Sequence, residues 1–410
     1  MGPLNANERG RFCEAGILAL VPDRWGLKWM SRHQLLTRLS QYFPVIWVNP
    51  AQEWRDALSN RSKARQGVLH NLSGFTVYDS RLFLKFYRPK RLAKWCDKKR
   101  LQQARDLLTR QGCKRIVLYL WRPEFGAALG IVPHDVSCYH IVDEYSFCES
   151  EVPLSKVERE VITGVDQVFV SSPALLEKKG WLNPRTAVVP NGVSYQTFST
   201  PLQEPQDLGE IPHPRIGYIG YLKKMLDWRL LSDLSLKHPS WSFVLVGAPL
   251  DQPEVTEGVR ELRTRPNVYM LGAKLTREFP AYPQHFDVCI MPYRSTAYTK
   301  YIYPLKLQEY LASGRPVVGT RIRTLEDYST VVRLAATPAE WSAAINKALE
   351  PTDNQPEKRA ERQAIARLHD WDLLTEQVAR ILSERLGLQC PERSPRGEPD
   401  FVPSEMFSET

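Results

Sequence analysis

A lysine and a glutamate in one predicted helix, Lys306 and Glu309, have the residue types and spacing that best suit chemistry in this chain. The pattern predicts a helix from Pro304 to Ser313, closed by Gly314. Pro304 leaves free N–H groups and the positive end of the helix dipole at the start of that helix. Lys306 opposes this dipole, but its position suits a bound phosphate. Glu309 lies on the same face and could accept hydrogen bonds from ribose hydroxyls.

A glycine turn, Gly217-Tyr-Ile-Gly220, ends an earlier predicted strand over residues 215–219. Glycines at a strand end let backbone N–H groups approach an anionic ligand. A tight turn built from small residues explains the same glycines. Likewise, residues 304–313 also fit an ordinary amphipathic helix whose leucines pack inward and whose charged residues face water. The residue types alone leave both alternatives open.

Strand-like and helix-like segments alternate through the chain, which predicts an α/β protein with two Rossmann-like parallel-sheet domains. Strands are expected at 16–21, 45–48, 116–120, 137–142, 167–171 and 186–189 in the first half, and at 215–219, 242–246, 268–271, 287–291 and 316–319 in the second. Ligands of such sheets bind outside the carboxyl ends of the strands. We therefore expect the two domains to face each other across a cleft.

The domain boundaries follow from composition. We predict a first domain over residues 1–198, a linker over 199–214 and a second domain over 215–368. The linker is rich in Pro, Gln, Asp and Glu and has no hydrophobic period. A C-terminal helix over 369–387 is expected to cross back to the first domain. The remaining residues, 388–410, are rich in Pro, Ser and Glu and are predicted to be disordered.

The overall composition is that of a cytoplasmic protein. The chain has 410 residues, of which 43% are hydrophobic and 25% charged, enough for two ordinary cores. No apolar run approaches the roughly 18 residues that span a membrane, and no secretory cleavage site follows the N-terminal apolar stretch. The 7 cysteines are scattered and never spaced as CxxC. This spacing argues for reduced thiols, without structural zinc or a disulfide framework.

The net charge of +9 is concentrated in one segment, from Arg81 to Arg115. A solvated helix face is the simplest explanation of such a run. A surface for anionic lipid headgroups is the second, because aromatic side chains such as Phe86 and Trp95 are interleaved with the charges. A nucleic-acid surface is the third, but the sequence contains no base-reading motif, and we expect no nucleic-acid partner.

Several blocks, from the end of the first predicted domain through the second, together resemble the GT-B glycosyltransferases of the family 4 type, which act on nucleotide-activated sugars. These blocks are Val188-Val-Pro-Asn-Gly-Val193, Arg215-Ile-Gly-Tyr-Ile-Gly-Tyr-Leu222, Phe243-Val-Leu-Val-Gly247, Pro266-Asn-Val-Tyr-Met-Leu-Gly272, Asp287-Val-Cys-Ile-Met-Pro292 and the run from Tyr303 to Val318. The first half is similar, more loosely, to a bacterial subgroup that makes surface polysaccharides, at Trp29–Gln34, His140–Tyr145 and Val168–Ser172. The resemblance implies an acceptor-binding first domain and a donor-binding second domain.

The resemblance also implies roles for donor-site residues. Gly217 and Gly220 would lie against the donor diphosphate, while Pro304 would fix the helix start. Lys306 would meet the phosphates as a catalytic cation, and Glu309 would meet the ribose. The backbone at Gly272 and Ala273 would hold the base. From its position after a strand end we add Arg294 as a second phosphate cation; a surface arginine fits equally well.

On the acceptor side, His33 is the first candidate, because it follows the first strand at the start of a helix. A histidine facing the cleft could assist a hydroxyl or bind a substrate, and a helix-capping hydrogen bond is the structural alternative. Asp143 and Glu144 are further candidates for acceptor binding. Neighbouring residues of a strand point to opposite faces, so these two acids do not form a metal-ligand pair.

The sequence departs from the family pattern at three positions. The first of the family's two spaced glutamates falls on Tyr301, and the usual arginine after the glycine loop falls on Tyr221. The family's usual lysine several positions later falls on Leu226, and Lys223 or Lys224 could replace it from nearby. These changes leave the donor sugar and the stabilisation of the leaving group undetermined.

The reaction implied is transfer of a hexosyl group from a nucleoside diphosphate sugar to an acceptor hydroxyl, with retention of configuration. Preorganised cations and helix N–H groups would stabilise the departing diphosphate, so no metal or other cofactor is expected. In a retaining enzyme the leaving phosphate could itself take the acceptor proton. The expected acceptor is a glycan or a lipid-linked sugar in surface polysaccharide or glycolipid synthesis, with peripheral attachment to the inner membrane face. The alternatives are a GT-B epimerase or phosphorylase and a degenerate nucleotide-binding scaffold.

Overall fold

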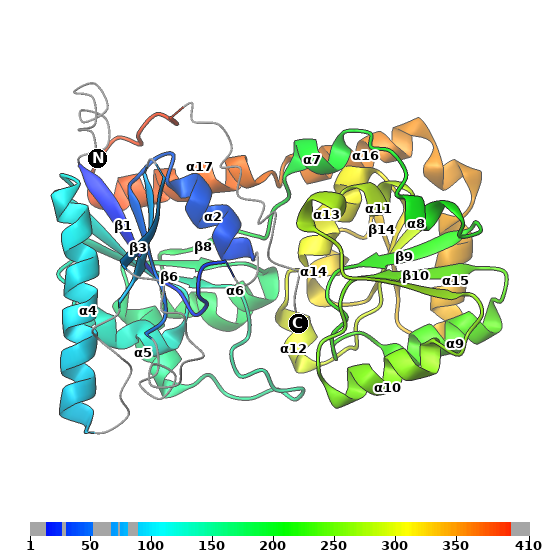
Figure 1. Cartoon of the computed structure of the whole chain (residues 1–410), viewed down its shortest axis with the longest axis horizontal. Coiled ribbons are helices and arrows are strands. Elements are labelled where there is room, and N and C mark those ends of the chain that lie inside the picture. Colours follow the sequence, from blue (N-terminus) through cyan, green and yellow to red (C-terminus); the bar gives the residue numbers. More distant parts are fainter. Residues whose placement is uncertain (1–13, 27–29, 52–66, 73, 81–88, 395–410) are drawn as a thin grey trace.

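The computed structural model divides the chain into two α/β domains that lie side by side (Figure 1). The structure describes residues 14–26, 30–51, 67–72, 74–80 and 89–394. Each domain is built on one sheet, with strand order β3-β4-β2-β1-β5-β6-β7-β8 in the first and β11-β10-β9-β12-β13-β14 in the second. All strand pairs are parallel except β3 with β4. The predicted fold class is confirmed.

The first domain runs from β1 to β8 along the chain. Its strands are β1 (Ala15–Leu20), β2 (Val45–Val48), β3 (Gly67–Leu72), β4 (Phe75–Asp79), β5 (Arg115–Leu120), β6 (Val136–Ile141), β7 (Gln167–Val170) and β8 (Thr186–Val188). Its helices are α2 (Ser31–Leu39), α4 (Lys90–Arg110), η1 (Pro123–Gly130), α5 (Lys156–Gly164), α6 (Pro173–Lys179) and η2 (Gly180–Leu182). Side chains of β1 alternate between two buried clusters, with Ile17 in one and Leu18 in the other. A parallel sheet covered on both faces requires this hydrophobic run.

The second domain has one core around its sheet. Its strands are β9 (Arg215–Ile219), β10 (Ser242–Val246), β11 (Val268–Gly272), β12 (Val288–Met291), β13 (Val317–Thr320) and β14 (Val332–Ala335). Its helices are α7 (Tyr195–Ser199), α8 (Gln206–Gly209), α9 (Trp228–Lys237), α10 (Pro253–Leu262), η3 (Thr276–Glu278), α11 (Ala281–Gln284), α12 (Ala297–Tyr301), α13 (Leu305–Ser313), α14 (Arg323–Glu326), α15 (Pro338–Ala348), η4 (Pro351–Asn354) and α16 (Pro356–Arg367).

The last helix, α17 (Trp371–Leu386), leaves the second domain and packs on the first (Figure 1). Its Trp371, Val378 and Leu382 are buried in the same cluster as Leu35 and Leu39 of α2. The helix therefore ties the end of the chain to the first domain, as expected.

Two segments are more ordered than their composition predicts. The linker contains α8, and its Leu208 and Ile211 are buried in the core of the second domain. At the C-terminus, the Ser394 amide donates to the carbonyl of Gln41 at 3.1 Å, so residues 388–394 lie against the first domain. Residues 395–410 of the predicted tail lie outside the described part of the chain.

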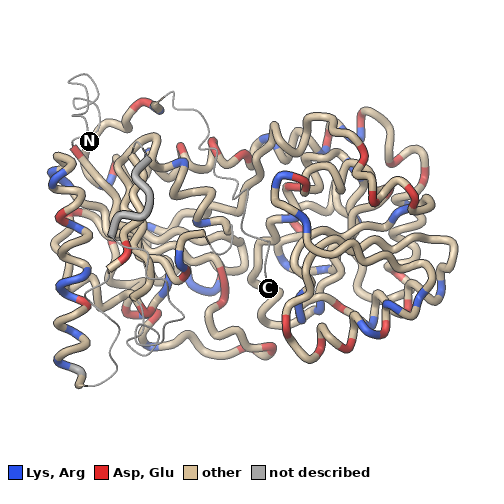
Figure 2. The backbone as a smooth tube through the Cα atoms, viewed as in Figure 1, with Lys and Arg blue, Asp and Glu red and all other residues tan. Residues whose placement is uncertain are grey.

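Helix α4 carries most of the described part of the basic segment (Figure 2). Lys94, Lys98 and Lys99 are exposed on it. Arg100 is different, because its side chain is buried and donates to the carbonyl of Asn49 at 3.0 Å. Arg100 therefore anchors α4 to the end of β2 and is not a surface charge. Residues 81–88 of the basic segment lie outside the described residues.

Candidate functional site

The ammonium group of Lys306 lies directly over the turn at Gly220. Gly220 has a φ of +133°, and a Cβ placed on it would come 2.3 Å from Lys306 Nζ. Only glycine adopts this backbone readily, and only glycine leaves room for the lysine. Pro304 is the N-cap of α13 rather than its first helical residue. The glycine turn and the start of α13 therefore lie close together, as predicted, and the Lys306 side chain fills the space between them.

Glu309 and two tyrosines surround this lysine. The Lys306 ammonium lies 5.2 Å from the centre of the Tyr218 ring. Burial raises the pKa of the Glu309 carboxyl, and the Lys306 charge opposes that rise. Burial also raises the pKa of Tyr218 and of Tyr293, so both stay neutral hydrogen-bonding groups. Among the described residues, neither the Lys306 ammonium nor the Glu309 carboxylate has a hydrogen-bond or ion-pair partner.

Backbone at the ends of the neighbouring strands β10 and β11 lies beside the Gly220 turn. Gly247, after β10, has a φ of +141°, and a Cβ there would come 2.1 Å from the Gly220 carbonyl oxygen. Its amide donates to the Gly272 carbonyl at 2.7 Å. Gly272 has a φ of +70° with open space beside it, and Ala273 is exposed. Sequence reasoning missed Gly247 as a site residue, although a glycine directly after a buried strand was the available signal.

Gly217 has a structural role that we had not predicted. It lies within β9, and a Cβ there would come 2.1 Å from the ring of Phe286. The glycine is required so that this buried ring can pack against the strand. Nothing in this geometry supports the predicted contact of Gly217 with a donor.

Arg294 is engaged across the domain interface. Its guanidinium makes two hydrogen bonds with Glu149 of the first domain, at 2.7 and 3.1 Å. The Ala297 amide donates to the Glu149 carbonyl at 2.8 Å. Such a bidentate pair fixes geometry, so the structure gives Arg294 an interdomain role instead of that of a free phosphate cation.

His33 lies at the start of α2, as predicted, but in an enclosed position. Its Nδ1 accepts a hydrogen bond from the Met30 amide at 3.1 Å, so the ring caps the helix. Its ring centre lies 4.5 Å from that of Trp47 and 5.3 Å from that of Trp25. Burial lowers its pKa to about 3, with the Arg32 charge as a second cause. The structure therefore supports the capping alternative, with a neutral imidazole.

Asp143 and Glu144 point to different environments. Asp143 is only partly buried, and the Tyr298 hydroxyl of the second domain donates to it at 3.3 Å. Glu144 is buried, and its carboxylate lies 3.2 Å from the ammonium groups of both Lys178 and Lys179. Glu144 is thus a partner in a buried charge cluster and does not face an acceptor. Of the three candidates predicted for the acceptor side, Asp143 is the one with a described contact to the second domain, through Tyr298.

The two tyrosines at positions of family departure behave differently. Tyr301 is buried in a core cluster of the first domain, although it belongs to α12 of the second. Its hydroxyl donates to Glu151 at 2.6 Å, and the Ser172 hydroxyl donates to its carbonyl at 2.7 Å. Tyr221 lies in the loop after Gly220, with the Lys223 ammonium 5.9 Å from its ring centre. Tyr301 therefore lies at the contact between the two domains.

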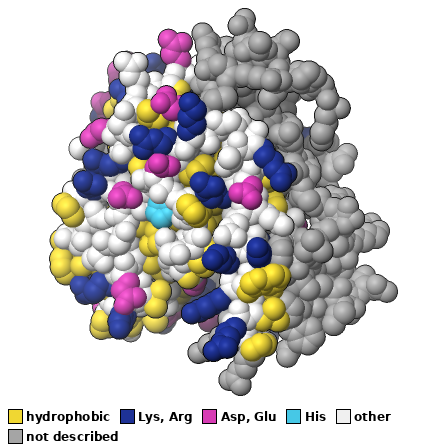
Figure 3. Space-filling view, turned by 90° about the vertical axis from the view of Figure 1, so that its left-hand side faces the viewer, with side chains coloured by type: hydrophobic (Ala, Val, Ile, Leu, Met, Phe, Trp, Pro, Cys, Tyr) yellow, Lys and Arg dark blue, Asp and Glu magenta, His cyan; other side chains and the backbone are white. Residues whose placement is uncertain are grey.

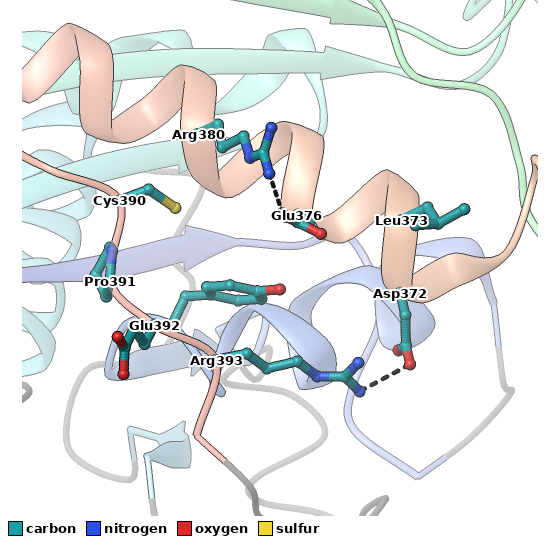
Figure 4. A pocket seen from close by; sticks show the side chains of 9 residues that line it. Asp372, Leu373, Glu376, Arg380, Cys390, Pro391, Glu392 and Arg393 are labelled. Atoms are coloured by element: carbon teal, nitrogen blue, oxygen red, sulfur yellow. Dashed lines mark hydrogen bonds and ion pairs between the residues drawn. The ribbon is translucent and has the colours of Figure 1, made fainter.

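A separate hollow lies between α17 and the segment that follows it (Figure 4). It is lined by Tyr42, Asp372, Leu373, Glu376, Arg380, Cys390, Pro391, Glu392 and Arg393. Two ion pairs lie along it, Arg393 with Asp372 at 2.7 Å and Arg380 with Glu376. None of its lining residues belongs to the strand ends or to α13, so it is not part of the candidate site.

The arrangement at Gly220, Lys306 and Glu309 can bind an anion beside a polyol. A cation and a glycine turn suit a diphosphate, and a carboxylate one helical turn away suits ribose hydroxyls. Within the described part of the chain, no group of three or more His, Cys, Asp or Glu side chains is placed to hold a metal ion.

Comparison with known proteins places this site in a family context. Residues 213–351 match the family model described as glycosyl transferases group 1. The chain is 29% identical over 377 residues to the putative teichuronic acid biosynthesis glycosyltransferase TuaH of Bacillus subtilis, covering 85% of this chain and 91% of that one.

Solved structures of similar fold cover nearly the whole chain. Sucrose-phosphate synthase from Thermosynechococcus elongatus has a TM-score of 0.67 at 15% identity, covering 91% of this chain and 99% of its own. An E. coli structure described as trehalose-6-phosphate bound with UDP-2-fluoro glucose has a TM-score of 0.66 at 12% identity, covering 92% and 100%.

The chain has the two-domain GT-B fold of these solved structures. Its second domain is a glycosyl transferase group 1 domain. The resemblance noted in the sequence is thus confirmed.

Proposed function

We propose that the protein transfers a hexosyl group from a nucleoside diphosphate sugar to an acceptor hydroxyl, with retention of configuration. The observation that carries this proposal is the Lys306 ammonium seated over the Gly220 turn, with Glu309 on the same helix. Strand ends at Gly247, Gly272 and Ala273 supply the backbone against which the nucleotide base would lie.

The chemistry asked of these residues is mainly electrostatic. In the transition state the sugar becomes oxocarbenium-like, and negative charge grows on the departing diphosphate. Lys306 and backbone N–H groups near Gly220 would stabilise that charge. Because they are already in place before the reaction, no free energy is lost in reorienting them in the transition state. On this scheme the site needs no metal.

The acceptor we propose is a glycan or a lipid-linked sugar in surface polysaccharide or glycolipid synthesis. The similarity to TuaH, which is described as a putative teichuronic acid biosynthesis enzyme, supports this assignment.

We further propose that the protein works in the cytoplasm, held reversibly on the inner face of the membrane. The described residues contain no helix that is long and apolar enough to cross a bilayer. Exposed lysines accompany Leu92 and Trp95, which are 37% and 52% exposed, on α4. Figure 3 looks at this side of the molecule, where Lys and Arg side chains are interspersed with hydrophobic and acidic ones. Basic and aromatic side chains together suit an anionic headgroup layer.

A screen over nucleotide sugars tests the central proposal. The purified protein would be incubated with UDP-glucose, ADP-glucose, GDP-mannose and UDP-glucuronic acid, and release of the nucleoside diphosphate measured. We expect at least one donor to be cleaved, faster when a suitable acceptor is present. Epimerised sugar without nucleotide release would indicate an epimerase, and dependence on inorganic phosphate a phosphorylase. Nucleotide binding without any turnover would indicate a degenerate nucleotide-binding scaffold, the alternative suggested by the departures from the family pattern at Tyr301 and Tyr221.

A further inference from the structure

The segment from Tyr301 to Leu305 joins α12 to α13, and Lys306 is the next residue. It belongs to the second domain by its place in the chain, but both of its ends rest on the first. The Tyr301 ring is buried in one core cluster of the first domain, and Leu305 packs against another. Helices α12 and α13 lie on the side of the second domain that faces the first (Figure 1). The start of the helix that carries Lys306 is therefore at the contact between the domains.

Two side chains of the first domain hold the backbone of this segment. The Ser172 hydroxyl, at the start of α6, donates to the Tyr301 carbonyl at 2.7 Å. The Asn191 side chain, three residues after β8, donates through Nδ2 to the Tyr303 carbonyl at 2.6 Å. Buried carbonyls need a donor, and here side chains supply it in place of a helix or a sheet ladder. The position of this backbone therefore depends on the first domain.

The body of α13 is held by its own domain. The Ile219 amide at the end of β9 donates to the Tyr310 hydroxyl at 3.0 Å, and Leu311 is buried in the core of the second domain. Before the helix, the Thr324 hydroxyl of the second domain donates to the Ile302 carbonyl at 2.7 Å. The fold of α13 therefore does not rely on the first domain, and losing one donor there should shift the start of the helix without unfolding it.

A shift of the Tyr303 carbonyl would reach Lys306 because the backbone between them is stiff. Pro304 is the N-cap of α13, and its ring fixes φ, which is −66°. The Pro304 carbonyl already accepts a hydrogen bond from the Leu307 amide at 3.2 Å. Lys306 lies in that first turn, and its ammonium fills the space over Gly220. Moving the Tyr303 carbonyl would therefore move the lysine relative to the glycine turn.

We propose that Asn191 and Ser172 are positioning residues for Lys306. They hold the start of α13 from the first domain, so that the ammonium stays over the Gly220 turn. The first domain thus contributes to stabilising the departing diphosphate, although the cation belongs to the second. This inference rests on the proposed function. A preorganised charge is effective only where it is in place, and a misplacement of about 1 Å can cost about 100-fold in rate.

The first test pair is Asn191→Ala with Asn183→Ala as its control. Asn191→Ala removes the donor to the Tyr303 carbonyl and introduces no charge. Asn183→Ala removes a like donor, whose Nδ2 bonds the Ile162 carbonyl at 2.8 Å within the first domain. Each protein would be assayed with the donor that the wild type cleaves fastest, among UDP-glucose, ADP-glucose, GDP-mannose and UDP-glucuronic acid, with water as the acceptor. We would measure kcat, donor KM, binding of the matching nucleoside diphosphate and the melting temperature.

The second test pair is Ser172→Ala with Ser155→Ala as its control. Both serines cap a helix, since the Ser172 hydroxyl oxygen accepts from the Leu175 amide at 3.2 Å and that of Ser155 from the Glu158 amide at 3.1 Å. Only Ser172 also donates to the Tyr301 carbonyl. The loss of the cap is therefore common to both variants, and a difference in kcat between them reports the bond to the segment before α13.

We expect Asn191→Ala and Ser172→Ala each to lower kcat by about 10-fold or more, with donor KM and nucleotide binding within about twofold. Both controls should lower the melting temperature and keep kcat within about twofold. The decisive measurement adds Asn191→Ala to Lys306→Ala. If Asn191 acts through the lysine, the second change should cost less than about twofold in kcat, because no ammonium remains to be misplaced.

Several outcomes would overturn the positioning role and leave the glycosyltransferase standing. One is an unchanged kcat in both Asn191→Ala and Ser172→Ala. Another is an equal fold-loss from Asn191→Ala with and without Lys306, since the residue would then support only the fold. A loss of kcat in the controls as large as in the test variants would have the same meaning. If Asn191→Ala does not fold, the serine pair decides. A wild type that cleaves none of these donors would refute the proposed function, and this inference with it.

Discussion

The hydroxyl of Tyr301 donates a hydrogen bond to Glu151 at 2.6 Å, and this contact joins the two domains. The Lys178 and Lys300 ammonium groups lie 4.5 and 5.2 Å from the centre of the same ring. The hydrogen bond from Tyr301, followed by contacts with Lys300 and Lys178, lowers the pKa of Glu151 to about 2. A lowered carboxyl pKa stabilises the folded state at neutral pH, and this contribution is lost as the pH falls from about 4.5 toward 2.

The first prediction is that restoring the family's glutamate will not restore a donor contact. Tyr301→Glu should lower the free energy of unfolding by about 3 kcal/mol, because it removes a ring that is 4% exposed from a core cluster. It should not raise turnover of any nucleotide sugar. Tyr301→Phe is the control: it keeps the ring and should cost about 1 kcal/mol for the hydrogen bond. Denaturant unfolding and the donor assay measure both. A gain of donor turnover in Tyr301→Glu would show that this position still faces the sugar.

Local sequence signals were sufficient to predict that Gly220 and Lys306 lie together in the candidate site. A proline before a helix, a lysine in its first turn and a glycine after a strand are each set by backbone geometry within a few residues. These signals correctly brought together Gly220 and Lys306, 86 positions apart, because parallel strands end at one edge of a sheet.

Signals that depend on contacts between domains were not readable from the sequence. Tyr301 and Glu151 are 150 positions apart, and Arg294 and Glu149 are 145 apart. A tyrosine or arginine after a strand has no periodic pattern that tells whether it faces a ligand or another domain. The burial of Arg100 within a run of surface lysines was also hidden, since its partner within the same domain is the Asn49 carbonyl, 51 positions away after β2.

A second prediction concerns Glu309. If its carboxylate receives ribose hydroxyls, Glu309→Ala should weaken nucleoside diphosphate binding by about 1.5–3 kcal/mol, or roughly 10- to 150-fold in Kd. Calorimetry with UDP, ADP and GDP measures the effect against Glu254→Ala, an exposed glutamate at the start of α10. A dissociation constant equal to that of the wild type would remove the ribose assignment.

A third prediction separates binding from catalysis at Lys306. Because charge on the leaving diphosphate grows in the transition state, Lys306→Ala should lower kcat by about 100-fold while changing donor KM much less. The exposed Lys347 offers a matched control, since it is 57% exposed and pairs with Glu350 on the surface. Steady-state kinetics at varied donor concentration distinguish the two effects. Intact kcat with a raised KM would mean that Lys306 only binds the donor.

A fourth prediction follows from the metal-free scheme. Prolonged treatment with EDTA, followed by assay in chelator, should leave most of the donor turnover intact, because the cation at the diphosphate is Lys306. Readdition of Mg²⁺ or Mn²⁺ after the treatment should not raise the rate more than about twofold. If EDTA abolished the activity and either ion restored it, a metal ion would be needed, together with Lys306, to stabilise the charge on the departing diphosphate.

The last prediction tests the membrane proposal on α4. Its exposed Lys94, Lys98 and Lys99 should each contribute about 1 kcal/mol near an anionic surface. Changing all three to Glu should abolish sedimentation with phosphatidylglycerol vesicles at low salt and leave donor hydrolysis unchanged. Arg100 is left in place, because its bond to the Asn49 carbonyl holds the helix and its loss would destabilise the domain.

The matched control makes the same change of charge on the second domain, at the exposed Lys237, Arg260 and Arg263. If binding depended on net charge alone, both triple variants would lose it equally. If α4 is the contact surface, only the first variant loses it. Wild-type binding should also weaken as sodium chloride rises, since the Debye length falls from about 30 Å at 0.01 M to about 8 Å at 0.15 M. Wild-type protein that stays in solution at every salt concentration would show that α4 is an ordinary solvated helix face, and would leave the glycosyltransferase assignment untouched.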